Sequence, residues 1–325
     1  MRYVITNVET SEGSHCLYSA MSFALQKSNF KLSETDIYFL GNGLSLWYNK
    51  GSNFKWVIPD IEVLESLQAN CEMPICFSFN VDDDFYRRAY QAIREDKIVF
   101  LYTYSQYLDY SDIYSGSAGH EHIINLYGYD EEEDKAYVSD SYLLDYSGKV
   151  LTYNGLATLS NIRKGTWGCA WFDQIPENQI SRDKIFQIAI GYIRKFLTEE
   201  KNERGDYYTG RAAFKEFFEE FDELMTYDDS SFKDITQKIY YDLRIANIMH
   251  IIHYLKSFVF ENSAYFGGKS DMLISSMEKL YLEWKKLLAN IYKSGFSLNR
   301  KSFPGIKRKA FELIDSLSAI LEEMI

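Results

Sequence analysis

Apolar and polar positions follow short, mixed patterns in the first half of the chain. Residues 97–104 form an unbroken apolar and β-branched run, which predicts a strand buried on both faces. Residues 123–129 and 135–140 flank the acidic segment 130–134, and this arrangement predicts a β-hairpin. The early part of the chain is therefore expected to contain a buried strand and a β-hairpin.

Other segments of the same half add strands and helices to this picture. Residues 148–153 and 165–172 are further strand candidates, and a short helical pattern over 154–162 lies between them. Residues 17–25 and 83–95 place apolar side chains three and four positions apart, which predicts helices. Strands and helices are thus interleaved, as in an α+β domain.

From about residue 178 the pattern becomes helical throughout. Five segments carry it: 181–197, 210–225, 235–260, 271–292 and 303–325. No strand is predicted among them. We therefore expect an α+β protein with two domains, residues 1–176 and an all-helical domain over residues 177–325.

Composition limits the classes of protein to which the chain can belong. Its 325 residues suffice for two domains, and 46% hydrophobic residues indicate a globular protein. No apolar run approaches the roughly 20 residues of a membrane span, and the N-terminus lacks the apolar region of a signal peptide. We expect a cytoplasmic protein with no membrane contact. The net charge of −12 argues against a nucleic-acid partner.

The cysteines point to thiol chemistry rather than to a scaffold. The chain has four, and none is in a CxxC pair, so neither a disulfide framework nor a zinc site is predicted. No metal or other cofactor is expected. Cys16 stands directly before the helical pattern, with Ser14 as the expected N-cap. The positive end of a helix dipole stabilises a thiolate at that place, although a buried core thiol explains the same pattern.

The predicted hairpin supplies two partners for such a thiol. If Tyr129 pairs with Lys135, Asp140 lies opposite Ile124, and His122 and Asp140 then share one face of the sheet. A slip of one residue would separate them. His120 shares the face of His122 and is the alternative base. The hairpin can therefore place an imidazole beside a carboxylate, as a Cys-His-acid site requires.

Three segments in this order resemble the N-terminal domain family of butirosin biosynthesis protein H, within the papain-like fold and near the C39-type peptidases. They are the His15-Cys16 pair with Ala20 inside the following helix, residues 32–44 with their Gly-Asn-Gly turn, and residues 122–140 with a Gly-Tyr-Asp sequence. The resemblance covers residues 1 to about 175. It implies a papain-like N-terminal domain in which Cys16, His122 and Asp140 are the catalytic residues.

The activity implied by this resemblance is acyl transfer. An acyl or aminoacyl group would pass from a carrier-protein thioester to a small amine through a Cys16 acyl-enzyme, in natural-product biosynthesis. Two alternatives stay open: a cysteine hydrolase of a peptide or amide, and a non-catalytic binding module on the same fold. C39-type peptidases carry a glutamine before the cysteine for the oxyanion hole, and here Asn7 is the available amide.

A few features outside these segments bear on partners. Basic residues gather around the start of the last predicted helix and form one basic patch: Arg300, Lys301, Lys307, Arg308 and Lys309. Such a patch could dock an acidic carrier protein, and a plain basic surface turn explains it equally well. The many tyrosines of residues 102–114 suit either an aromatic-lined pocket or core packing. The sequence leaves open whether the chain forms a homo-oligomer.

Overall fold

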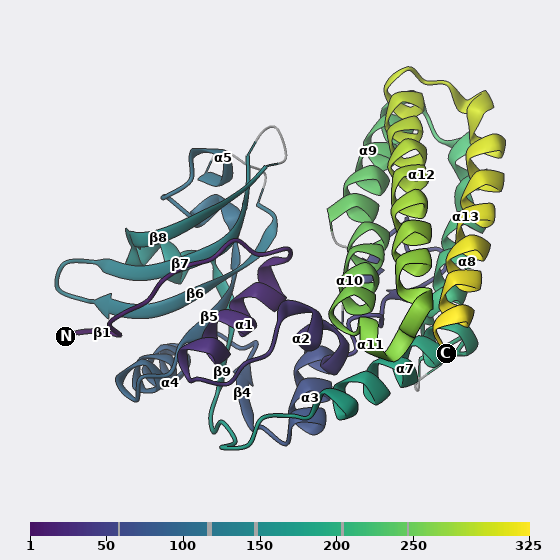
Figure 1. Cartoon of the computed structure of the whole chain (residues 1–325). Coiled ribbons are helices and arrows are strands. Elements are labelled where there is room, and N and C mark those ends of the chain that lie inside the picture. Colours follow the sequence, from purple (N-terminus) through teal and green to yellow (C-terminus); the bar gives the residue numbers. More distant parts are fainter. Residues whose placement is uncertain (58, 116–118, 146–148, 203–204, 246) are drawn as a thin grey trace. The chain divides into compact units, whose positions relative to one another are not determined.

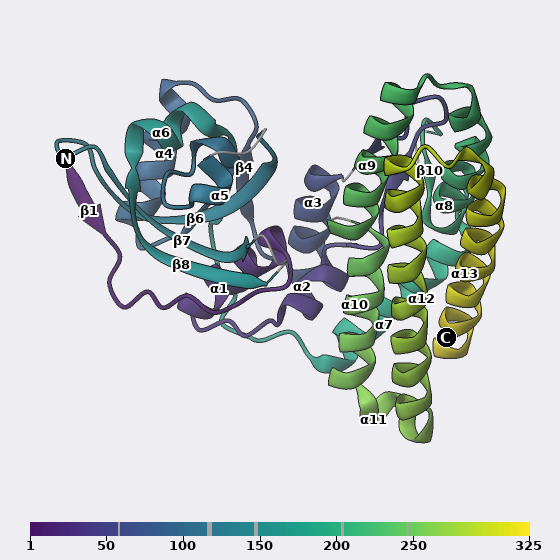
Figure 2. The same cartoon turned by 90° about the horizontal axis from the view of Figure 1, so that it is seen from above.

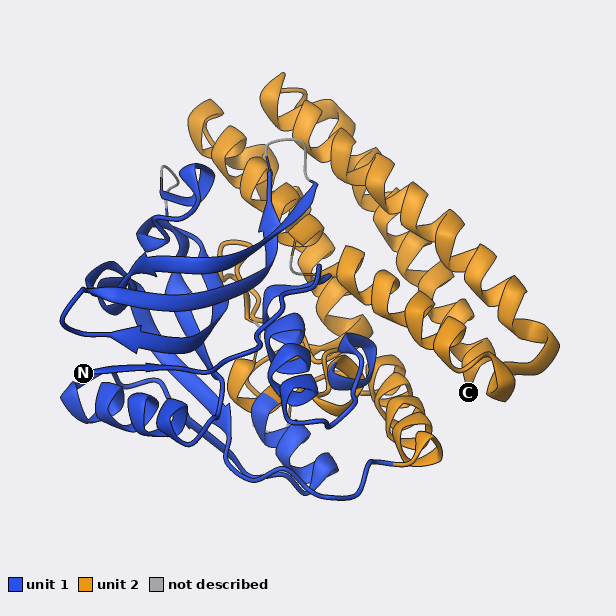
Figure 3. Ribbon diagram, turned by 60° about the vertical axis from the view of Figure 1, so that its left-hand side comes forward, with its two compact units in different colours: residues 1–37, 64–180 blue, residues 38–63, 181–325 orange. Residues whose placement is uncertain are grey.

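The computed structural model describes the whole chain except residues 58, 116–118, 146–148, 203–204 and 246 (Figure 1). Helices and an antiparallel sheet are both present, which confirms the α+β class. The chain divides into two compact units (Figure 3): residues 1–37 with 64–180, and residues 38–63 with 181–325. The sequence-based boundary at 176/177 stays a prediction, and the units differ from it by placing residues 38–63 with the second half of the chain.

The first unit is built on a seven-stranded antiparallel sheet of order β4-β9-β5-β6-β7-β8, with β1 paired to β6. Its strands are β1 (Arg2–Val4), β4 (Ile75–Ser78), β5 (Val99–Tyr104), β6 (Glu121–Asp130), β7 (Lys135–Leu144), β8 (Val150–Thr158) and β9 (Thr166–Phe172). The predicted buried strand is confirmed as β5, in which every residue except the last is buried. The predicted hairpin is confirmed as β6 and β7, which Figure 2 shows side by side.

Strand β8 differs from the prediction at both of its ends. The helical pattern over residues 154–162 was wrong for its first half, because β8 continues to Thr158 and only Leu159–Gly165 form a helix, α6. Eight residues of β8 pair with β7, and these ladder hydrogen bonds override a weak local helical preference. The strand predicted over 148–153 begins at Val150 in the structure, and its first residue, Gly148, lies outside the described residues.

The register of the hairpin differs from the prediction at the turn and agrees with it farther along. Asp130 pairs with Lys135 and Gly128 with Tyr137, one residue away from the expected pairing. The register then shifts between Leu126 and Gly128, so that Leu126 pairs with Val138 and Asn125 with Ser139. Continued by one residue, this ladder puts Ile124 opposite Asp140, as predicted. The extra residue on β6 is Tyr127, the site of a β-bulge.

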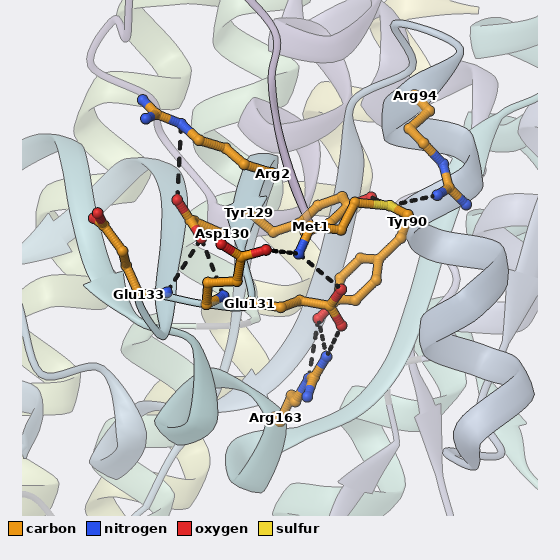
Figure 4. A network of polar contacts seen from close by, with 10 residues as sticks. Met1, Arg2, Tyr90, Arg94, Tyr129, Asp130, Glu131, Glu133 and Arg163 are labelled. Atoms are coloured by element: carbon orange, nitrogen blue, oxygen red, sulfur yellow. Dashed lines mark hydrogen bonds and ion pairs between the residues drawn. The ribbon is translucent and has the colours of Figure 1, made fainter.

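The N-terminal strand is held at the turn of the hairpin (Figure 4). The amino group of Met1 lies 3.4 Å from a carboxylate oxygen of Glu132 and 3.9 Å from one of Glu131. Arg163 pairs with Glu131 at 3.1 Å. Exposed ion pairs of this kind contribute about 0–1 kcal/mol each, so the backbone pairing of β1 with β6 is the main attachment. Gly128 of β6 permits the close approach of β1, because a Cβ there would lie 2.9 Å from the Tyr3 carbonyl oxygen.

Helices cover the sheet of the first unit. They are α1 (Cys16–Lys27), α4 (Asp83–Arg94), α5 (Asp112–Ser115), α6 and the 3₁₀ turn η1 (Ser105–Tyr107), while α2 (Glu34–Leu40) and α3 (Asp60–Cys71) each cross from one unit into the other. The predicted helices over residues 17–25 and 83–95 are confirmed as α1 and α4. Helix α1 contacts strands β5, β6, β7 and β9, and residues 17–25 are all buried. It is therefore the central helix of this unit.

The second unit is mainly helical, and a small sheet belongs to it. Its helices are α7 (Arg182–Thr198), α8 (Gly210–Glu219), α9 (Asp229–Ile245), α10 (Ile248–Glu261), α11 (Ser263–Phe266), α12 (Ser270–Phe296) and α13 (Phe303–Met324), with 3₁₀ turns η2 (Glu220–Thr226), η3 (Gly267–Lys269) and η4 (Arg300–Ser302). Strand β10 (Tyr208–Thr209) pairs with β2 (Trp47–Tyr48), which pairs with β3 (Trp56–Val57). The all-helical prediction for residues 177–325 is thus not confirmed. A two-residue strand carries no periodic signal.

The helices of this unit agree with the sequence pattern except at one break. The segment predicted as one helix over residues 235–260 is two helices, because α9 ends at Ile245 and α10 begins at Ile248. Asn247, with φ −140° and ψ −123°, interrupts the helical backbone. Helix α12 packs against α9, α10 and α13 (Figure 2). Among the described residues, no helix is both long and apolar enough to cross a membrane.

Buried aromatic side chains fill the core of the second unit. Phe214, Phe217 and Phe221 are each at most 1% exposed, which supports core packing for this stripe. The carboxylate of Glu220 is buried among them and accepts hydrogen bonds from the Tyr48 hydroxyl and the Gly51 N–H, both at 2.6 Å. This buried carboxylate ties residues 48–51 to the helices, which explains why a segment from the first half of the chain belongs to this unit.

Candidate active site

Cys16 is the first residue of α1, and its position depends on the residue before it. The N-cap is His15 and not Ser14 as expected. His15 has an extended backbone, and its Nδ1 atom accepts a hydrogen bond from the Leu17 N–H at 3.2 Å. Ser14 instead donates its own N–H to the carboxylate of Glu34 at 2.9 Å. An imidazole nitrogen thus takes the place of the usual side-chain oxygen of an N-cap.

His122 and Asp140 lie on neighbouring strands, and their side chains meet. His122 of β6 is 6% exposed and Asp140 of β7 is 1% exposed. The distance from His122 Nε2 to Asp140 Oδ2 is 2.8 Å. The bulge at Tyr127 is required for this contact, because without it the two side chains would point to opposite faces of the sheet.

The Cys16 thiol completes the group. Its sulfur lies close enough to the His122 ring to raise the pKa of that imidazole. Since Nε2 of His122 faces Asp140, the ring nitrogen that is left for the thiol is Nδ1. The structure thus brings together all three residues that the sequence selected, with the carboxylate on Nε2 of the imidazole and the thiol beside the ring.

The carboxylate of Asp140 is fixed by further hydrogen bonds. Its Oδ1 accepts the backbone N–H of Tyr142 at 3.0 Å, and its Oδ2 accepts the hydroxyl of Tyr110 at 2.9 Å in addition to the His122 contact. A buried carboxylate with three such donors has little freedom to rotate. Asp140 is therefore arranged to orient the His122 ring.

The electrostatics favour a charged His122 and a neutral His15. Burial by itself lowers the pKa of His122, but the Asp140 carboxylate and the Cys16 sulfur outweigh it and raise that pKa to about 10. Burial, together with the charge of His122, lowers the pKa of His15 to about 4. His15 is neutral at pH 7 and, because Nδ1 accepts from Leu17, carries its proton on Nε2.

The alternative base predicted from the sequence has a different place. His120 is exposed and precedes β6, and its backbone N–H donates to the Ser105 hydroxyl at 3.0 Å. The carboxylate of Asp140 is contacted by His122 instead. The geometry therefore favours His122 over His120 as the base.

Two tyrosines next to the site were not singled out by sequence reasoning. Tyr110 donates to Asp140, and the Tyr114 ring lies edge-on to the His122 ring with centroids 5.0 Å apart. Both belong to the tyrosine-rich segment of residues 102–114. The abundance of tyrosine was the available signal. It did not distinguish a site from core packing.

The structure does not support Asn7 as the oxyanion donor. Asn7 is exposed, and its carbonyl oxygen accepts a hydrogen bond from Lys27 Nζ at 3.2 Å. Lys27 is the last residue of the 12-residue α1, so Asn7 lies beside the end of a helix about 16 Å long, opposite Cys16. The N–H groups of the first turn of α1 have no intrahelical partner, and the Cys16 N–H is the nearest candidate.

The basic patch in the second unit is largely neutralised within the protein. Lys307 lies 2.7 Å from carboxylate oxygens of both Glu219 and Asp222. Arg300 pairs with Asp229 at 2.9 Å, and Lys309 pairs with Glu283 and Glu312. Lys301 and Arg308 are exposed. Any docking role of the patch therefore falls mainly on these two.

Residues 15–141 match the family model described as butirosin biosynthesis protein H, N-terminal. The match begins at the N-cap of the cysteine helix and ends one residue after Asp140, so that it contains Cys16, His122 and Asp140. No curated protein matches the chain. Among the described residues, no three metal-ligating side chains gather into a group that could hold a metal ion.

Proposed function

We propose, on the premise that residues 15–141 belong to the N-terminal domain family of butirosin biosynthesis protein H, that this chain is a cysteine-dependent acyltransferase of natural-product biosynthesis. It moves an acyl or aminoacyl group from a carrier-protein thioester to a small amine and so forms an amide. The observation that carries the proposal is the Cys16–His122–Asp140 group, in which the buried imidazole and carboxylate are in contact and the half-buried thiol lies beside the ring.

In the first half-reaction the Cys16 sulfur attacks the thioester carbonyl carbon. Because His122 is charged at neutral pH, its ring already carries the proton on Nδ1, and Asp140 stabilises this imidazolium through Nε2. The tetrahedral intermediate then collapses, the bond to the carrier sulfur breaks, and His122 returns the proton to the leaving thiol. The high pKa of His122 suits this step, because it keeps the imidazolium available as the acid.

In the second half-reaction an amine attacks the Cys16 acyl-enzyme. His122 takes a proton from the attacking nitrogen, the carbon–sulfur bond breaks, and the Cys16 thiol is restored as the amide leaves. In both halves negative charge develops on the carbonyl oxygen. The Cys16 N–H at the positive end of α1 is placed to stabilise that charge.

The arrangement of elements supports a papain-like fold for the first unit. A buried helix carries the nucleophile at its N-terminus, and the antiparallel sheet that it contacts carries the base and the acid on adjacent strands. A papain-like fold is what the family resemblance implies. We therefore propose a papain-like fold for the first unit.

Acyl transfer is tested by the mass of the intact protein after incubation with a panel of acyl thioesters. We expect one added acyl group on the protein, located on Cys16 by peptide mapping, and its release as an amide when a suitable amine is added. Release at the same rate in water without any amine would favour the hydrolase. A protein that gains no mass across the panel, with a Cys16 inert to iodoacetamide near pH 7, would contradict the proposal.

Docking of an acidic carrier protein on the basic patch is a separate part of the proposal. Because Lys301 and Arg308 are exposed, we expect the double variant Lys301→Glu/Arg308→Glu to slow acyl loading from the carrier several-fold at low salt, while loading from a small thioester is unchanged. Lys307 is unsuitable, since its reversal would place a third carboxylate beside Glu219 and Asp222.

The matched control reverses two other exposed lysines, Lys269 at the N-cap of α12 and Lys279 within that helix, in the variant Lys269→Glu/Lys279→Glu. It changes the net charge by the same amount and should load from the carrier faster than the patch variant does. Equal slowing in both variants would show a general charge effect and would remove the patch from the proposal.

A further inference from the structure

Asp140 Oδ2 is shared by two donors. His122 Nε2 lies 2.8 Å from it, and the Tyr110 hydroxyl donates to it at 2.9 Å. The second carboxylate oxygen is occupied by the Tyr142 N–H. A hydroxyl on the same oxygen as the imidazole influences both the direction of that oxygen and the negative charge that it presents to the ring.

Tyr110 is itself held firmly in place. Its ring stacks on the ring of Tyr153 with centroids 4.3 Å apart and planes 9° apart. Tyr153 belongs to β8 and pairs directly with Asp140 in the sheet, while its own hydroxyl donates to the Leu156 carbonyl oxygen at 2.6 Å. Asp140 and Tyr153 are therefore neighbours in the sheet. The ring of Tyr153 positions Tyr110 next to the Asp140 carboxylate.

We propose that Tyr110 is a positioning residue of this site: its hydroxyl keeps Asp140 Oδ2 directed at His122 and withdraws part of the carboxylate charge from the imidazole. The catalytic consequence rests on the proposed function, whereas the effect on the imidazole rests only on the geometry. His122 is thereby held in one orientation. At the same time its proton is bound weakly enough to be given to a leaving thiol.

The other ionisable groups around the pair do not replace this effect. His122 is faced by Cys16 from α1, by His15 from the N-cap and by Tyr114 from α5, besides Asp140. His15 is neutral at pH 7, and the Tyr114 hydroxyl donates to the Tyr142 carbonyl oxygen rather than to Asp140. Among the described residues, Tyr110 and His122 are thus the two side chains that form a hydrogen bond to the Asp140 carboxylate.

Removal of the hydroxyl has a predictable sign. Without it the Asp140 charge acts on His122 with less competition, so the imidazolium is favoured and the pKa of His122 moves further up. We expect a rise of about half to one pH unit for Tyr110→Phe, the size expected for loss of one hydrogen bond to a charged group. The turnover rate should fall about 3- to 10-fold, with little change in KM, because the ring orientation loosens and the proton is returned less readily.

The measurement is an NMR titration of the His122 ring in the full chain, made in the Cys16→Ala background so that the thiol does not titrate with it. The titration is compared among three proteins: Cys16→Ala alone, Cys16→Ala with Tyr110→Phe, and Cys16→Ala with Tyr153→Phe. The variant His122→Gln identifies which signal belongs to His122. Tyr153→Phe is the matched control, because it removes a hydroxyl from the stacked ring without touching Asp140. The titration of His122 in this control should coincide with its titration in Cys16→Ala alone.

A Tyr110→Phe titration that coincides with the control would overturn the inference. Incorporation of 3-fluorotyrosine at position 110 gives a second test that retains the shape of the side chain. The more acidic phenol donates more strongly, so the His122 titration should move down, and the absence of any shift would again overturn the inference. Because these titrations do not use the acyl-enzyme, a failure to form it would count against the proposed function and not against the role of Tyr110.

Discussion

Replacing Cys16 with alanine is expected to abolish the acyl-enzyme and to lower the rate of amide formation by about 10⁴-fold or more. The variant lacks the atom that bonds to the acyl group, so only binding and the backbone oxyanion donor remain. The loss is measured by the mass of the intact protein after a thioester pulse and by the rate of amide release. Cys16→Ser should also fail to accumulate acyl-enzyme, because an alcohol is a far weaker nucleophile than a thiol at neutral pH.

Cys76→Ala is the matched control for this loss. Cys76 is a partly exposed thiol on β4, and burial raises its pKa, so it is a poor nucleophile at pH 7. The control should load and transfer the acyl group at the wild-type rate. Loading that persists in Cys16→Ala and disappears in Cys76→Ala would contradict the assignment of the nucleophile.

Asp140→Asn is expected to reduce turnover by about 10³- to 10⁴-fold while the protein stays folded. The Tyr142 N–H keeps the amide oxygen at the Oδ1 position, so the amide NH₂ group occupies the Oδ2 position and faces His122 Nε2. Nε2 must then be an acceptor, and the ring proton moves to Nδ1, the atom that has to receive the proton of Cys16. A neutral ring in the wrong tautomer cannot act as the base, which is the reason for a large loss at a nearly isosteric change.

Steady-state rates and thermal unfolding together check this prediction. Asp134→Asn removes a carboxylate at the far end of the same hairpin, where Asp134 bonds Ser160, and should keep wild-type activity. The pH profile gives a further sign, because loss of the Asp140 charge should lower the pH at which the imidazolium of His122 loses its proton. An Asp140→Asn protein with normal activity would mean that Asp140 orients no catalytic imidazole.

Local sequence patterns were sufficient for the elements that carry the site. The buried run at 97–104, the hairpin arms around an acidic turn and the apolar repeat after Cys16 each predicted an element that the structure contains. These patterns are short-range, since each reflects which face of one segment is buried. The identities of Cys16, His122 and Asp140 likewise suggested a thiol, a base and an acid without any knowledge of their contacts.

The tertiary structure decided how these parts meet. The pairing at the hairpin turn differs by one residue from the expected one, and only the bulge at Tyr127 returns His122 and Asp140 to one face. A bulge depends on the neighbouring strands, here including β1 against Gly128, and has no pattern within the hairpin itself. The cap by His15 and the exclusion of Asn7 likewise follow from where α1 packs.

Long-range contacts also determine hydrogen-bond partners and unit membership, which no local sequence pattern predicts. Tyr110 reaches Asp140 across 30 positions of sequence, and residues 38–63 join the helical unit through Glu220, about 170 positions away. Amphipathic periodicity records burial, but it does not record the partner against which a residue is buried. The sequence by itself therefore determined the elements and the chemical groups of this protein, whereas the register, the hydrogen-bond partners and the composition of the two units were decided only by the packing of distant segments.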